Sequence, residues 1–228
     1  MKTFPIFTAL AALAIPTAVY FVFNVAPLEV EMGVIQKIFY FHVSSAWLCY
    51  LGFILCAGGS LAYLWKRNTR ADAFALASAE VGLLFGLIVL TTGPLWARPV
   101  WGVYWKWEPR LTSMALMVVI FGAYWMLRTF GGTGEGVRRF ASVLGVFGAP
   151  NIFFVHFAVK MWRGNHPQVL NINGGGGISP EMRTTLYGVA LPALLLLFGL
   201  LLRLRYKALI DERTVKAMRR RLARIGVF

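Results

Sequence analysis

Long apolar segments separated by short polar ones make up most of the 228 residues of this chain. Six such segments can be marked, at residues 4–27, 40–65, 73–95, 111–128, 140–162 and 184–204. Each is close to the roughly 20 residues that an α-helix needs to cross the hydrocarbon core of a bilayer. The pattern therefore predicts an all-α integral membrane protein with six transmembrane helices, which form a single membrane domain over residues 1–228.

The composition agrees with this class, because 58% of the residues are hydrophobic and only 14% are charged. Soluble domains carry about 25% charged residues. The first apolar segment follows Lys2 like a secretory signal, but it is too long for one, and "FVFNVAP" is a poor cleavage site. We expect it to be a retained helix. The net charge of +14 indicates topology and contact with the lipid bilayer, not binding to nucleic acid.

The distribution of basic residues predicts the orientation. With six spans both termini lie on one side, and 16 of the 23 lysines and arginines fall on that side. Basic residues concentrate on the cytoplasmic side of membrane proteins, so both termini are expected in the cytoplasm. Residues 203–228 then form a basic cytoplasmic tail, expected as a solvated helix near the lipid headgroups. The segments between spans one and two, three and four, and five and six face outward.

The tryptophan-rich segment, residues 96–110, belongs to this outer face. It contains Trp96, Trp101, Trp105 and Trp107, half of the tryptophans in the chain. An interfacial aromatic belt explains one or two indoles at a helix end, but four in twelve positions exceed that pattern. Trp101 and Trp105 would share a face if this segment were helical. Such a surface favours a large, flat, apolar ligand that needs stacking as well as burial.

Three histidines, His42, His156 and His166, are also expected at or near the outer face of the membrane. Neutral imidazole is a common ligand of transition metals, and two histidines from separate segments can hold one heme iron from opposite sides. Zinc requires a tighter set of ligands than this sequence offers. Taken singly, His42 and His166 are each better explained as an interfacial polar group than as a ligand. His156 most resembles a polar contact within the membrane, and we keep it as a reserve ligand.

Three further residues within the apolar segments bear on function. Cys49 and Cys56 form no CxxC or CxxCH motif, so we expect buried thiols, with no redox role and no covalent attachment of heme. Glu80 lies in the third segment, where a carboxylate needs a partner. A hydrogen bond to a neighbouring helix explains Glu80 better than a polar route for heme.

The sequence "WGVYWKWEPRLTS" resembles the WWD motif of heme-handling membrane proteins, whose pattern is WGxxWxWDxRLT. The matching residues are Trp101, Gly102, Trp105, Trp107, Arg110, Leu111 and Thr112. Glu108 stands where the family has aspartate, which retains the carboxylate but moves it by one methylene. "IFYFHVSSAW" and "MWRGNHPQ" resemble the segments that carry the family's two outer histidines. Among WWD proteins, a chain of six spans resembles the heme exporter protein C (CcmC) family.

This resemblance implies a function in cytochrome c-type biogenesis and heme transport. Heme b would be held at the outer, periplasmic face of a bacterial inner membrane and delivered to a CcmE-type heme chaperone. The expected partners are the CcmA and CcmB subunits of an ABC transporter complex and a CcmD-type small membrane protein. The chain has no Walker A motif, so another subunit would hydrolyse ATP.

The resemblance also implies roles for individual residues. His42 and His166 would be the axial ligands of the heme iron, with Trp101, Trp105 and Trp107 as the platform. Gly102, Glu108 and Arg110 would support the platform, or Arg110 would contact a heme propionate.

Three alternatives remain open at this stage. A CcsA-like cytochrome c synthetase would join heme to apocytochrome c itself, but such chains are longer and contain more histidines. A b-type cytochrome places histidine pairs inside its spans. A structural subunit without heme would leave the tryptophan-rich segment unexplained. Whether the chain acts as a scaffold or as an enzyme does not follow from the sequence.

Overall fold

The computed structural model describes residues 3–162 and 178–225, and this part of the chain is almost entirely helical. Its α-helices are α1 (Thr3–Tyr20), α2 (Ile38–Lys66), α3 (Thr69–Trp101), α4 (Pro109–Phe130), α5 (Glu135–Gly148), α6 (Asn151–Trp162), α7 (Pro180–Thr185) and α8 (Leu191–Arg224). Short π-helical turns extend α1 over Phe21–Val25 and join α7 to α8 over Leu186–Ala190. A 3-10 turn, Val34–Lys37, precedes α2.

Six helical stretches of the described residues are long and apolar enough to cross a membrane. They are Pro5–Val25, Val34–Lys66, Thr69–Trp101, Pro109–Phe130, Glu135–Phe157 and Pro180–Arg224. Over the described residues, this confirms the prediction of an all-α fold with six helical stretches that can cross a membrane. The fifth stretch consists of two helices, α5 and α6, which are separated at Ala149 and Pro150 because proline cannot donate the helical hydrogen bond.

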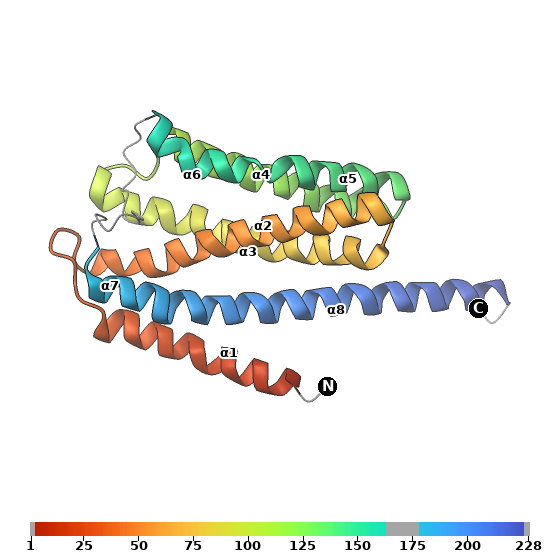
Figure 1. The fold of residues 1–228 in the computed structure, drawn as a ribbon, viewed down its shortest axis with the longest axis horizontal. Coiled ribbons are helices and arrows are strands. Elements are labelled where there is room, and N and C mark those ends of the chain that lie inside the picture. The colour runs from red at the N-terminus through yellow and green to blue at the C-terminus, as the bar shows by residue number, and fades with distance from the viewer. Residues whose placement is uncertain (1–2, 163–177, 226–228) are drawn as a thin grey trace.

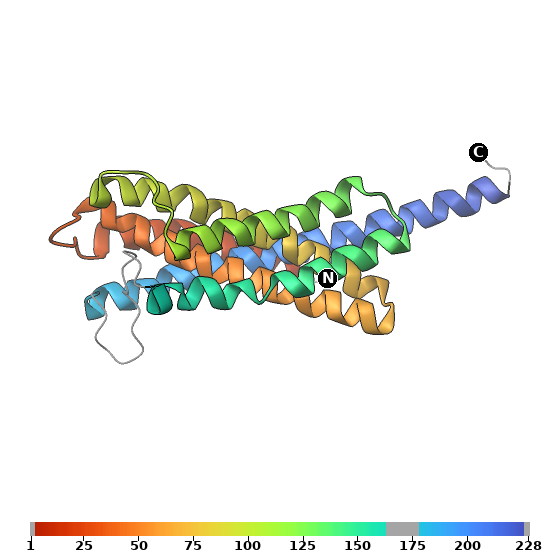
Figure 2. The ribbon, with the colours of Figure 1, turned by 90° about the horizontal axis from the view of Figure 1, so that it is seen from above.

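The helices are arranged in layers (Figures 1 and 2). The hairpin of α2 and α3 forms the centre, with α4, α5 and α6 on one side and α8 on the other. Helix α1 is outermost and packs on α8. The turn between α3 and α4, the C-terminal end of α6 and the loop after α1 lie at one end of the bundle. We call this the tryptophan end, and both chain termini point toward the opposite end.

Small residues allow α2 and α3 to approach closely. A Cβ atom on Gly52 would lie only 2.6 Å from the Cα of Gly82, so the two backbones are in contact. Small residues favour this packing where lipid supplies no hydrophobic drive between helices. Next to the contact, the ring of Phe53 stacks on that of Phe121 on α4, with centroids 3.8 Å apart. The core therefore joins α2, α3 and α4 into one packed unit.

Ion pairs between helices hold the end of the bundle opposite the tryptophan end. The buried carboxylate of Asp72 accepts hydrogen bonds from Arg128 on α4 at 2.9 Å and from Arg213 on α8 at 2.7 Å. The guanidinium of Arg205 donates to both carboxylate oxygens of Glu80. The prediction that Glu80 contacts a neighbouring helix is confirmed. The expectation of a fully solvated tail is wrong for its first part, because Arg205 and Arg213 anchor α8 to α3.

Candidate functional site

The tryptophan-rich segment is partly helix and partly loop. Helix α3 continues to Trp101 and ends at Gly102, whose backbone φ of +75° is a left-handed conformation that glycine adopts easily. The Gly102 N–H donates to the carbonyl of Arg98 at 3.0 Å, and α4 begins at Pro109. Trp101 and Trp105, which would share one face of a continuous helix, do not do so here, because α3 ends between them.

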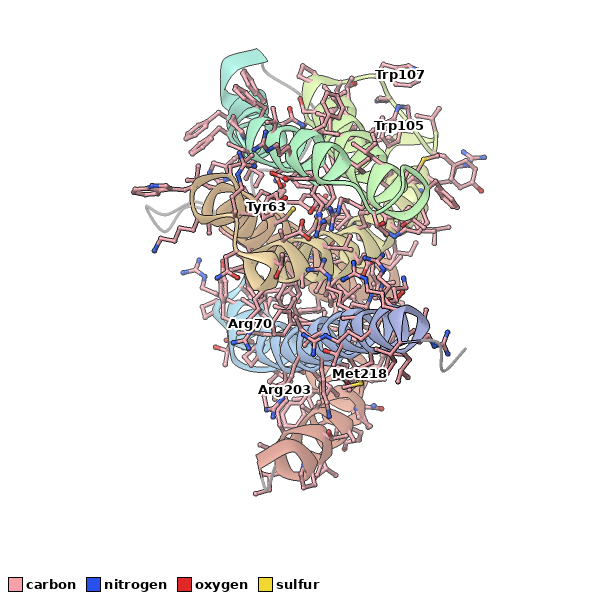
Figure 3. All side chains as sticks on the ribbon, turned by 90° about the vertical axis from the view of Figure 1, so that its right-hand side faces the viewer. Tyr63, Arg70, Trp105, Trp107, Arg203 and Met218 are labelled. Atoms are coloured by element: carbon pink, nitrogen blue, oxygen red, sulfur yellow. The ribbon has the colours of Figure 1, made fainter. Side chains whose placement is uncertain are left out.

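The loop places its indoles edge to face. The rings of Trp105 and Trp107 lie 5.7 Å apart at 77°, at the edge of the bundle beside α4 (Figure 3). Trp107 is 82% exposed, whereas the Nε1 of Trp105 is buried and has no hydrogen-bond partner among the described residues. The ammonium of Lys106 lies 5.5 Å from the ring centre of Trp101. Only one ring of the perpendicular pair can lie parallel to a flat ligand at a time.

His42 lies in the second turn of α2, near the tryptophan end, and is buried. Its Nδ1 is 2.9 Å from the hydroxyl of Thr92 on α3, and this hydroxyl donates its only hydrogen to the carbonyl of Ile88 at 2.7 Å. Both contacts can be hydrogen bonds at the same time only if the hydroxyl accepts from His42, and this arrangement places the proton of a neutral ring on Nδ1. Nε2 then carries the lone pair. Histidines that bind metals are usually oriented in this way by a hydrogen bond from the other ring nitrogen.

Trp96 is the close aromatic neighbour of His42. The two rings meet edge to face with centroids 5.8 Å apart, and the Trp96 Nε1 lies 3.3 Å from the sulfur of Met32. Gly93 leaves room for the imidazole, since a Cβ there would lie 3.3 Å from its Cε1. Trp96 belongs to the tryptophan-rich segment, but the sequence predicts no separate role for it. Because Trp96 and Trp101 are five residues apart, they lie on different faces of α3. This spacing is the feature of the sequence that indicates a separate position for Trp96.

Glu108 and Arg110 lie where the loop enters α4. Glu108 is the N-terminal cap residue of α4 and is buried, and its carbonyl accepts from the Thr112 N–H at 3.0 Å. Arg110 is half-buried in the first turn and lies within electrostatic range of the His42 imidazole. The structure therefore brings Arg110 to the same region as His42.

The two other histidines belong to the chain's fifth span and to the segment after it. His156 is exposed on α6, with its ring edge to face against Phe157 at 5.1 Å. Asn151 donates to the carbonyl of Ser113 at 2.8 Å, which fixes the register between α6 and α4. Counting about 1.5 Å per residue from this bond, His156 lies near the level at which α4 begins. His166, the second predicted axial ligand, lies outside the described residues.

Comparison with known proteins connects this arrangement to a family. The sequence profile of heme exporter protein C matches residues 1–221. The chain belongs to the heme exporter protein C family. The resemblance noted at the WWD motif is thus confirmed over almost the whole chain. The family consists of multi-pass membrane proteins of heme export and cytochrome c biogenesis.

Individual relatives are similar over shorter stretches. Heme exporter protein C of Bradyrhizobium diazoefficiens is 34% identical over 151 residues, which are 66% of this chain and 57% of that protein. A ccmC-like mitochondrial protein of Marchantia polymorpha is 32% identical over 149 residues, which are 65% of this chain and 63% of the relative. Heme exporter protein C of Escherichia coli K12 is 29% identical over 194 residues, 84% of this chain and 78% of the relative. The chain therefore spans less than two thirds of the first two relatives.

Proposed function

We propose that this chain binds heme b at its tryptophan end and delivers it to a CcmE-type heme chaperone during cytochrome c maturation. Heme is the cargo of this step. His42 and His166 are the axial ligands, and Trp101, Trp105 and Trp107 contact the macrocycle. His156 is the reserve ligand. This role is consistent with the heme exporter names of the bacterial relatives.

The observation that carries this proposal is the hydrogen bond between His42 and Thr92. The tautomer that satisfies both contacts of the Thr92 hydroxyl has its proton on Nδ1, and it leaves the Nε2 lone pair for a metal. Trp96 packs edge to face against the ring, and a Cβ on Gly93 would lie only 3.3 Å from its Cε1, so little rotational freedom is lost when a ligand binds. A histidine prepared in this way suits an iron ligand better than a solvated interfacial group.

The surrounding side chains suit the other parts of heme. The exposed indole of Trp107 and the partly buried indole of Trp105 offer apolar surface outside the helices. Arg110, close to His42, can form a charge-assisted hydrogen bond with a propionate. Gly102 and Glu108 support this arrangement, because the first ends α3 and the second begins α4.

The orientation follows from the positive-inside rule. The basic residues concentrate at the end of the bundle that is opposite the tryptophan end. We therefore assign that end to the cytoplasm and the heme site to the periplasmic face of the inner membrane. Both termini are then cytoplasmic, and heme is presented where apocytochrome c is matured.

The remaining partners supply the ATP hydrolysis for which this sequence has no motif. Because it has no Walker A motif, we assign ATP hydrolysis to a CcmA/CcmB ABC transporter, with a CcmD-type small membrane protein as a further subunit. The chain then acts as the site where heme is held and oriented for the chaperone.

Purification with and without a CcmE-type chaperone tests the proposal. Heme should purify with the chain alone, and the chaperone should bind to heme-loaded chain at least tenfold more than to heme-free chain. The variant His42→Ala, which lacks one proposed ligand, should purify with less heme than the unmodified chain and should bind less chaperone. If the chain instead attached heme to apocytochrome c without any chaperone, the CcsA-like synthetase alternative would replace this proposal.

A further inference from the structure

The last part of α8 carries an apolar stripe on an otherwise basic helix. Val215, Met218 and Leu222, at spacings of three and four residues, share one helical face, and Ile225 follows three residues later as the C-terminal cap residue of α8. Val215 is 47% exposed, Met218 57% and Ile225 72%. Such a narrow stripe is typical of a seam between two helices. We call it the tail seam.

Positive charge surrounds the tail seam. Residues 214–225 contain five basic residues and no acidic one. At 3.6 residues per turn, Arg219 and Arg221 border the two edges of the seam, and Arg220 lies on the opposite face. A second copy of this helix would therefore be repelled at both edges. A helix with acidic residues at its flanking positions would be attracted.

Ion pairs fix where the seam projects. Arg213 donates to Asp72 and to the carbonyl of Thr69, the first residue of α3, so Arg213 lies level with the turn between α2 and α3. Residues after Arg213 continue as unbroken helix and run past the ends of the other helices (Figures 1 and 2). Ile225 lies about 18 Å beyond Arg213 along the axis. Met218 is on the side of α8 that faces away from α2 and α3 (Figure 3).

This position separates the seam from the lipid. The headgroup layer on each side of a bilayer is only roughly 5–8 Å thick. The seam could lie on the membrane surface only if α8 broke near Arg213, yet the helix is continuous there and is anchored by two ion pairs. The seam therefore faces water at this end of the bundle.

We propose that the tail seam docks an amphipathic helix of a partner protein. The partner helix presents apolar residues in a matching stripe and acidic residues at the flanks, and the two helices pack as a short coiled coil. This inference rests on α8 alone and does not depend on heme binding at the other end of the molecule.

Photo-crosslinking in cells that mature cytochrome c with this chain tests the proposal. p-Benzoylphenylalanine is placed in the full chain at Met218 or Leu222 within the seam, or at Arg220 on the opposite face as the matched control. The seam positions should give adducts with one protein, at an apolar segment flanked by acidic residues, and position 220 should give at least fivefold less. Val215→Asp should reduce the adduct at position 222 at least fivefold, and Ala217→Asp should leave it unchanged.

A second measurement addresses the lipid. Met218→Cys is labelled with a membrane-impermeant maleimide in nanodiscs of phosphatidylcholine or phosphatidylglycerol, where the buried Cys49 and Cys56 do not compete. Equal labelling rates are expected. Tenfold slower labelling in the anionic lipid would overturn the proposal. So would equal adducts on both faces of the tail, adducts with a second copy, or no protein adduct at the seam.

Discussion

Replacing Asp72 by asparagine should strongly destabilise the bundle. The Asp72 side chain is 1% exposed and that of Arg128 is 6% exposed, so the variant leaves a buried guanidinium without its anion. Breaking one partner of such a pair costs about 3–5 kcal/mol. Arg213, whose side chain is 30% exposed, remains hydrated and adds little. For a chain of this size the loss corresponds to a melting temperature lower by roughly 6–20 °C.

The two native cysteines make the assay simple. Cys49 and Cys56 are fully buried, so a thiol-reactive fluorogenic dye reports the temperature at which the core opens. Asp211→Asn, which removes the same charge from an exposed position of α8, is the matched control and should cost less than about 0.5 kcal/mol.

A double variant tests the electrostatic explanation directly. Arg128→Met added to Asp72→Asn removes the uncompensated charge and should restore at least about 1 kcal/mol. Equal melting temperatures for Asp72→Asn and the exposed control would refute the buried ion pair as a stabilising contact.

Three other substitutions probe separate parts of the structure. Gly52→Ala should cost about 1–3 kcal/mol in the same melting assay, because its Cβ would meet the backbone of Gly82, whereas Gly58→Ala on the same helix enters open space and should be neutral or stabilising. Glu80→Gln should cost only about 1 kcal/mol, since its arginine partner is 40% exposed, and should leave the heme content of the purified protein unchanged; loss of heme would contradict the assignment of Glu80 as a helix contact. In Gly102→Ala the added methyl group meets no neighbouring atom, but the left-handed end of α3 is strained by about 1–2 kcal/mol. The melting temperature should therefore fall only slightly, whereas the heme content measured by the pyridine hemochrome assay should fall clearly. An unchanged heme content would show that this turn does not support the site.

The membrane-spanning pattern could be predicted from sequence because hydrophobicity alone decides which segments enter a bilayer. The helix ends could not. The apolar part of the last span ends at residue 204, and the structure continues it as a single helix, α8, to Arg224, in agreement with the helix expected for the basic tail. Charged residues normally mark the end of a span. Here Arg205 and Arg213 form ion pairs with carboxylates on α3, and these ion pairs hold the helix against the bundle beyond the apolar segment. Such pairings between distant segments leave no periodic signal in the sequence.

The candidate site was only partly accessible to sequence reasoning. Side-chain chemistry and motif spacing indicated His42 and the tryptophan-rich segment as candidates, because four indoles in twelve positions exceed an interfacial aromatic belt. The contact of His42 with Thr92 and Trp96 depends on the rotation of α2 against α3, which the glycine contact at Gly52 sets. The perpendicular indoles of the loop likewise depend on where Gly102 ends α3.

The absorption spectrum of heme bound to His42→Ala tests the central claim most directly. We predict that the purified variant lacks the low-spin spectrum of bis-histidine heme, that added imidazole restores it, and that His156→Ala retains it. An unchanged low-spin spectrum in His42→Ala would contradict the claim that this imidazole, held through Nδ1 by Thr92, binds the iron.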